Sequence, residues 1–226
     1  MLFLSLLAAQ TLPGSVEELL ALAATRSATV RPGLHDGTID RVYVNFGIDR
    51  LGNIDQVKQQ WNAIGFLRTW WYDPRLAYNA TAVGTSEISL RIDQFSLVWQ
   101  PDLYWEKLEE ISGVSASDGY GEVINIYPDG SVWRSQQRKV VLACPINLGH
   151  MPFDTQTCHW LMGMYADRAD EVTVQWKDGR PGIEGWEVAC PSLWLPIAAR
   201  QEDTTVSYPS GNYSYAESEI DFIRRK

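Results

Sequence analysis

The sequence lacks any run of about eighteen consecutive apolar residues, which is the length that an α-helix needs to cross a bilayer. We therefore expect the 226 residues themselves to fold as a soluble domain. Histidine is scarce, and His35, His150 and His159 show no zinc-ligand spacing. Gly-x-Ser-x-Gly and phosphate-binding glycine motifs are also missing. These absences predict no catalysis, no cofactor and no metal site.

Basic residues are outnumbered in this chain. The 19 lysines and arginines stand against 28 aspartates and glutamates, which gives a net charge of −9 and a pI of about 4.8. Such a chain repels a phosphate backbone, so nucleic acid is not an expected partner. Cations, amines or Ca²⁺ are the partners that this charge favours.

Apolar residues, in contrast, are plentiful: they make up 45% of the chain and include 10 tryptophans, enough for a substantial core. After residue 33, short alternating apolar and polar segments between turn residues predict about ten strands. They cover residues 41–48, 63–71, 86–92, 122–127, 131–134, 138–143, 159–164, 172–176, 194–199 and 219–223. Pro128-Asp129-Gly130 predicts a hairpin turn. The pattern indicates an all-β, immunoglobulin-like sandwich.

The N-terminal part differs from the rest. Ser15 and Glu18 have the spacing of a capping box, and the leucines that follow predict an amphipathic helix ending near Thr25. Residues 1–14 are apolar and resemble either a short secretory signal or a helical extension that ends at Pro13-Gly14. We expect residues 15–226 to form a single domain.

The most distinctive stretch covers residues 144–158 and reads Cys-Pro-Ile-Asn-Leu-Gly-His-Met-Pro-Phe-Asp-Thr-Gln-Thr-Cys. Pro145 and Pro152 remove backbone donors, and Gly149 permits a tight reversal, so a long helix or a central strand is disfavoured. We expect a protruding loop. Its two cysteines are either joined or are two thiols that merely lie near each other in the sequence.

This loop resembles the signature loop of the Cys-loop (pentameric ligand-gated) receptors and of their soluble relatives, the acetylcholine-binding proteins. Those proteins also have thirteen residues between the cysteines, and Met151 stands where they have an aromatic residue. Four further segments are similar to family motifs in the same order. They are Trp71-Tyr72-Asp73-Pro74-Arg75-Leu76-Ala77-Tyr78, Trp99-Gln100-Pro101-Asp102-Leu103, the Asp129-Gly130 turn and the C-terminal residues 221–226.

The resemblance implies a β-sandwich behind an N-terminal helix, a Cys144–Cys158 disulfide, an extracellular location and a ring of five copies, a homo-pentamer. Closing about fifteen residues would restrict the unfolded chain by roughly 3 kcal/mol. Ligands in this family bind between neighbouring subunits. Segments A, B and C of one subunit face segments D, E and F of the next.

Counting from the matched motifs gives the ligand-binding positions that the resemblance implies. They are Trp105 and Glu106 in segment A, Tyr165 in B, Tyr208 and Tyr215 in C, Phe66 and Arg68 in D, and Asn125, Trp133 and Ser135 in E. Segment F, about residues 177–193, does not align. Members that bind acetylcholine surround its ammonium with aromatic faces, each contributing about 0.5–2 kcal/mol. Ordinary packing inside the sandwich is the alternative role for each aromatic residue.

Departures from the acetylcholine-binding members shape the expected ligand. Glu106 stands where they have tyrosine, and residues 209–212 replace their vicinal cysteine pair. A carboxylate favours an amine that can donate hydrogen bonds. Arg68 would suit the carboxylate of an amino-acid-like ligand, or would pair with Glu106 and close the site. We therefore expect a small cationic or zwitterionic ligand.

Several features leave alternatives open. Sequons at Asn79 and Asn212 predict glycosylation and agree with secretion, and pairing of the loop cysteines would leave Cys190 over. The basic C-terminal end fits either a soluble binding protein or the ectodomain of a membrane receptor. A secreted β-sandwich that binds carbohydrate or serves as an interaction module is a further interpretation, and so is a ring whose pocket binds nothing.

Overall fold

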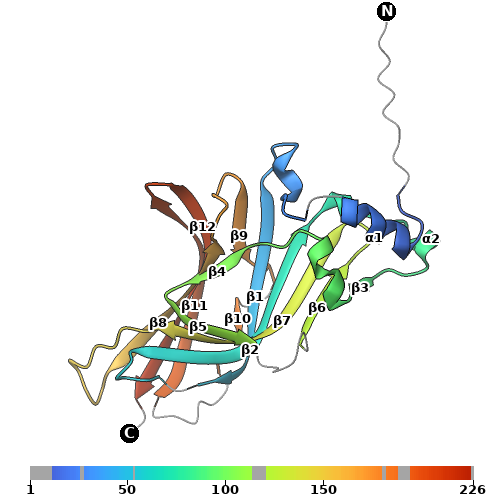
Figure 1. The fold of residues 1–226 in the computed structure, drawn as a ribbon. Coiled ribbons are helices and arrows are strands. Elements are labelled where there is room, and N and C mark those ends of the chain that lie inside the picture. Colours follow the sequence, from blue (N-terminus) through green and yellow to red (C-terminus); the bar gives the residue numbers. More distant parts are fainter. Residues whose placement is uncertain are drawn as a thin grey trace, which may run out of the picture.

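The computed structural model describes residues 12–25, 28–52, 54–113, 121–179, 182–187 and 194–224, and it shows two β-sheets with helix α1 (Val16–Thr25) at one end (Figure 1). The strands are β1 (Asp40–Leu51), β2 (Gln60–Tyr72), β3 (Ile88–Leu90), β4 (Leu103–Glu106), β5 (Leu108–Gly113), β6 (Glu122–Ile126), β7 (Ser131–Ala143), β8 (Thr155–Met164), β9 (Val172–Trp176), β10 (Ile183–Glu184), β11 (Trp194–Tyr208) and β12 (Gly211–Arg224). Short helices η1 (Pro32–Leu34), η2 (Pro74–Leu76), α2 (Ala80–Val83) and η3 (Ile92–Leu97) lie in the connections.

The strands divide into a large and a small sheet. The large sheet has the order β10-β1-β2-β7-β6-β3, with β5 paired to β7 and β9 paired to β1. The small sheet has the order β11-β12-β8-β4. The sandwich predicted from the alternating segments is therefore confirmed.

Alternation along the strands decides which side chains enter the core. In β2, Trp61, Ala63, Leu67 and Trp71 are buried, whereas the even-numbered residues between them reach the outer face. The inner faces meet through Trp61 and aromatic residues of the small sheet, with Trp61 lying 6.0 Å from Trp160, ring centre to ring centre. Each such side chain contributes roughly 1.5–3 kcal/mol through burial. This core fixes the orientation of both outer faces.

The helix and the hairpin turn form as the sequence predicts. The backbone N–H of Glu18 donates to Ser15 Oγ at 3.1 Å, and the Glu18 carboxylate accepts from the N–H of Gly14 at 2.8 Å. Leu19 of α1 is fully buried. At the hairpin, Gly130 adopts a φ of 89°, which a residue with a Cβ rarely adopts.

Several boundaries differ from the prediction. Residues 131–143 form the one strand β7 rather than two strands, and β11 and β12 extend far beyond the segments predicted for them. β4, β5 and β10 were not predicted, and β3 covers only the middle of its predicted segment. Residues 1–11, most of the predicted extension, lie outside the described residues. The long β11–β12 hairpin ends in a tip that stands away from the body (Figure 1).

Candidate functional site

Five tyrosines come together where the β11–β12 hairpin meets β4 and the end of β8. The rings of Tyr104 and Tyr165 lie 5.5 Å apart and nearly perpendicular, and those of Tyr104 and Tyr215 lie 6.1 Å apart. Tyr208 packs edge-on against Tyr213 at 5.8 Å. We call Tyr104, Tyr165, Tyr208, Tyr213 and Tyr215 the tyrosine cluster.

The hydroxyl groups of this cluster are connected. The Tyr104 and Tyr215 hydroxyl oxygens lie 2.5 Å apart, and the Tyr215 hydroxyl donates to that of Tyr208 over 3.5 Å. Burial raises the pKa of Tyr215 far above its ordinary value, and the pKa of Tyr104 is raised by burial as well. Both phenols therefore stay neutral near pH 7.

Strand register explains why these side chains meet. Tyr215 of β12 lies opposite Gly163 of β8, which in turn lies opposite Tyr104 of β4. A Cβ on Gly163 would come within 2.6 Å of the Tyr215 ring, so the glycine leaves the space that this ring fills. Tyr215 is 1% exposed at the base of the cluster, while Tyr165 is 71% exposed at its rim.

The two predicted segment A residues point in opposite directions. Trp105 is buried, and its ring lies 6.0 Å from that of Trp160 in the core, so it supports the strand from behind and does not reach the outer face. Glu106 lies on the outer side with Tyr104, two residues along the same strand. Tyr104, which was not predicted, is therefore the segment A residue in the tyrosine cluster.

Phe66 and Arg68 lie on the outer face of the large sheet. Along one row of this face, Asn45 of β1 is opposite Arg68, and Arg68 is opposite Ser135 of β7. The neighbouring row joins Trp70 to Trp133. The residues predicted for segments D and E thus share one surface.

Arg68 is held in place by neighbours in its own chain. Its Nη1 donates to Asn45 Oδ1 at 2.8 Å and to Glu184 Oε2 at 3.0 Å. A Cβ on Gly47 would lie 2.9 Å from the same Nη1, so the guanidinium rests directly on the glycine backbone. Within the described part of the chain, Nε and Nη2 have no partner and remain available to an acceptor.

The segment E residues and an adjoining cavity complete this surface. The buried Asn125 side chain donates to Glu87 Oε1 at 2.6 Å. Beside this surface a cavity of about 570 Å³ is lined by residues that include Tyr43, Trp70 and Lys177. The Lys177 ammonium lies 4.8 Å from the centre of the Tyr43 ring.

The tyrosine cluster and the Arg68 surface occupy the outer faces of different sheets. Because the two sheets of a sandwich pack through their inner faces, their outer faces point in opposite directions. Tyr215 and Phe66 of one chain therefore face away from each other. A pocket that uses both surfaces requires a second copy.

The predicted disulfide is present. Cys144, directly after β7, is bonded to Cys158 of β8 with both residues fully buried, so the bond joins the two sheets. Asp154 of the intervening loop pairs with Arg224 at the end of β12, through Nε–Oδ1 and Nη2–Oδ2 contacts of 2.9 Å each. This ion pair and a hydrogen bond from Gln156 hold the pKa of Asp154 far below its ordinary value.

Both predicted glycosylation residues are exposed. Asn79 Oδ1 caps α2 by accepting from the N–H groups of Thr81 and Ala82. Asn212 lies at the hairpin tip, where its Oδ1 accepts from Ser207 Oγ at 2.7 Å. Cys190 lies outside the described residues. Occupancy by a glycan stays a prediction.

A disulfide-linked β-sandwich with an aromatic cluster under a projecting hairpin defines a ligand-binding domain of the Cys-loop receptor class. The family described as "Neurotransmitter-gated ion-channel ligand binding domain" matches residues 17–225, and the chain belongs to this family.

Curated relatives agree with this assignment. The chain is 25% identical over 217 residues to glycine receptor subunit beta of Rattus norvegicus, covering 95% of this chain and 43% of the relative. It is 26% identical over 199 residues to the same subunit of Homo sapiens, with 87% and 39% covered. The chain thus spans less than half the length of these relatives. Of the helices described, none has the length and apolar character required to span a bilayer.

Proposed function

We propose that the chain is an extracellular binding domain that takes up a small amino-acid-like zwitterion between neighbouring copies in a five-membered ring. One observation carries this proposal: each chain bears an aromatic, oxygen-rich surface and a cationic surface that point in opposite directions. In a closed ring, the aromatic surface of one copy faces the cationic surface of the next.

The tyrosine cluster suits the ammonium group of the ligand. The electron-rich faces of its rings attract a cation by about 0.5–2 kcal/mol each, depending on desolvation. Neutral phenol oxygens accept hydrogen bonds, which a primary ammonium donates and a quaternary one does not. Glu106, on the outer side beside Tyr104, adds a negative charge that further favours a cation.

The opposite surface suits the carboxylate. Arg68 is 26% exposed, and its guanidinium is oriented by Asn45 and Glu184, with Nε and Nη2 without partners in the described chain. Preorganisation of this kind lowers the entropic cost of binding. A carboxylate that accepts from two guanidinium nitrogens forms the strong bidentate type of hydrogen bond.

The names of the relatives agree with a zwitterionic ligand. Both are subunits of a glycine receptor, and glycine carries one ammonium and one carboxylate. We propose glycine and slightly longer ω-amino acids as the first ligands to test. We assign no catalytic role. In a longer chain with membrane helices, binding would bias a pore through different affinities for its two states.

Light scattering combined with size exclusion tests the ring, and titration of tryptophan fluorescence tests the ligand. We expect a five-fold particle that responds to glycine or an ω-amino acid more strongly than to ethylamine or tetramethylammonium. Arg68→Gln should remove this preference, and Tyr208→Ala should weaken all binding. Arg91→Gln is the matched control because Arg91 is 80% exposed in an isolated surface pair.

Each alternative predicts a different result. A monomer at micromolar concentration would favour an unrelated secreted β-sandwich. A ring without any fluorescence response would indicate a degenerate pocket. Tight binding of tetramethylammonium that is insensitive to Arg68→Gln would indicate a ligand recognised by its cation alone.

A further inference from the structure

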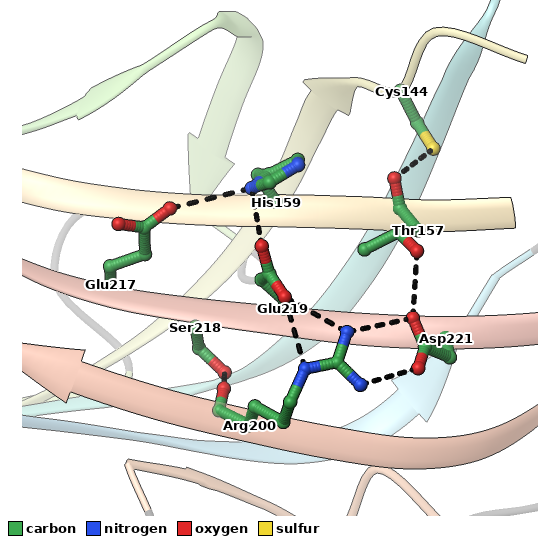
Figure 2. Close-up of polar contacts among 8 residues, drawn as sticks. All are labelled: Cys144, Thr157, His159, Arg200, Glu217, Ser218, Glu219 and Asp221. Atoms are coloured by element: carbon green, nitrogen blue, oxygen red, sulfur yellow. Dashed lines mark hydrogen bonds and ion pairs between the residues drawn. The ribbon is translucent and has the colours of Figure 1, made fainter.

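A second group of chemically active side chains lies on strands β8 and β12 of the small sheet (Figure 2). His159 of β8 is directly opposite Glu219 of β12, and Glu217 is two residues away on the same strand face. His159 Nδ1 lies 3.4 Å from Glu217 Oε1 and 3.4 Å from Glu219 Oε1. One ligand atom from each residue lies within 4.8 Å of the others.

We propose that His159, Glu217 and Glu219 bind a divalent transition-metal ion of the Zn²⁺ type. Zinc accepts imidazole nitrogen and carboxylate oxygen at about 2.0–2.2 Å in tetrahedral geometry. The edges of such a tetrahedron measure about 3.3–3.6 Å. The two distances from His159 Nδ1 fall within this range. Three protein ligands leave a fourth position for water.

Hydrogen bonding alone explains the positions of His159, Glu217 and Glu219 less well than a bound metal ion does. Nδ1 of an imidazole carries at most one hydrogen, whereas two carboxylate oxygens lie at equal distances from it. Distances of 3.4 Å also exceed the usual range of about 2.7–3.2 Å for such a bond. An ion placed among the three atoms would satisfy all of them at once.

The surrounding charges favour uptake of a cation. Glu202 of β11 lies opposite Glu217, and like charges in such cross-strand pairs are destabilising. On the other side, Glu106 of β4 is opposite Leu161, the residue that also faces Glu217. A positive ion beside Glu217 would relieve this repulsion.

Arg200 supports the site from the side. Its Nε and Nη2 donate to Glu219 Oε2 at 3.1 and 2.9 Å, and its Nη1 donates to Asp221 Oδ2 at 2.6 Å (Figure 2). Glu219 is thereby held with Oε1 toward His159. Partners that orient a ligand in this way increase metal affinity.

The cluster is open to solvent, with His159, Glu217 and Glu219 side chains 37%, 23% and 32% exposed. A mixed nitrogen and oxygen set suits Zn²⁺ better than Ca²⁺ or Mg²⁺, which prefer oxygen ligands alone. Histidine spacing along the sequence did not reveal this set, because its ligands come from two strands.

Calorimetric titration of the full chain with ZnCl₂ at about pH 7.4 in a non-coordinating buffer tests the proposal. We expect one Zn²⁺ per chain and weak or absent binding of Ca²⁺ and Mg²⁺. His159→Ala and Glu217→Gln should each lower the Zn²⁺ affinity at least about tenfold. Visible d–d absorption of Co²⁺ gives a second readout that a merely structural change does not produce.

Matched controls exclude other ligands. His150→Ala removes an exposed histidine of the Cys loop, Glu202→Gln removes a neighbouring charge, and Cys190→Ser removes the third cysteine. All three should leave the stoichiometry of one unchanged. The proposal is wrong if the wild-type chain binds no Zn²⁺, if His159→Ala binds as the wild type does, or if Cys190→Ser alone abolishes binding. Circular dichroism confirms that each variant is folded.

Discussion

Replacement of Asp154 by asparagine tests how strongly the Cys loop is attached to the last strand. In the structure, Asp154 and Arg224 side chains are 2% and 9% exposed, and two contacts of 2.9 Å join them. The Arg224 guanidinium also lies 4.4 Å above the Trp194 ring. Asp154→Asn keeps the size of the side chain and removes the charge that balances this arginine.

The expected loss of stability is large because the remaining charge stays buried. Removal of one partner from a buried ion pair costs roughly 3–5 kcal/mol. For a domain of about this size, 1 kcal/mol corresponds to roughly 2–4 °C in Tm. We therefore expect Asp154→Asn to lower Tm by roughly 6–20 °C.

The pH dependence follows from the lowered pKa of Asp154. In the folded state this carboxyl stays ionised at pH values below its unfolded pKa of about 3.9. Its contribution to the free energy of unfolding is therefore complete above that pH. The contribution is lost as the pH falls from the unfolded pKa toward the folded one. The difference between wild type and Asp154→Asn should stay constant from about pH 5 to 8 and shrink below about pH 4.

Reversible urea unfolding at fixed protein concentration measures these differences. Asp93→Asn is the matched control, since Asp93 and Arg91 form a surface pair with side chains 67% and 80% exposed. This control should cost at most about 1 kcal/mol. If Asp154→Asn costs no more than Asp93→Asn, the ion pair does not hold the loop.

Three further outcomes are expected. Gly163→Ala should lower the free energy of unfolding in urea by roughly 1–3 kcal/mol, because the added Cβ displaces the Tyr215 ring. Gly14→Ala is the control and should leave the free energy of unfolding nearly unchanged, because the nearest atom to an added Cβ is 3.7 Å away. Reduction of the Cys144–Cys158 bond should lower the unfolding free energy by about 3 kcal/mol, and an unchanged value would contradict the loop-closure estimate. In a spectrophotometric pH titration, Tyr215→Phe should remove a phenol that ionises well above the ordinary pKa of about 10. If the variant instead lacks a phenol that ionises near pH 10, Tyr215 is not buried.

The sequence allowed the fold to be predicted where a local pattern decides the structure. Alternation of apolar residues predicted the buried face of β2, and the Asp129-Gly130 turn predicted the β6–β7 hairpin. The family motif around Cys144 and Cys158 implied the bond that links the sheets. These features depend on neighbours in the sequence or on a motif that is read as a whole.

Features that depend on distant partners were not predictable in the same way. The carboxylate that pairs with Arg68 is Glu184 of β10, which lies 116 positions along the chain. The sequence suggested Glu106 of a neighbouring copy as a partner for this arginine, and that pairing stays a prediction, since Glu106 and Arg68 of one chain lie on different sheets. β10 has only two residues, too few for a periodic signal. Pairing of such a short strand with β1 becomes visible only in the folded chain.

The choice of residue in segment A shows most clearly what a motif count omits. Counting from Trp99 selected Glu106 and its neighbour Trp105. The side chains of a strand alternate between its two sides, however, so Trp105 enters the core while Tyr104 and Glu106 share the outer side. Trp105→Ala should therefore destabilise the fold by roughly 3–5 kcal/mol in urea unfolding, because it leaves a cavity beside Trp160. Tyr104→Ala should cost much less stability and should weaken ligand binding, measured by fluorescence titration. If the two variants exchange these effects, Trp105 rather than Tyr104 faces outward from β4, and the ammonium site must be rebuilt around Trp105.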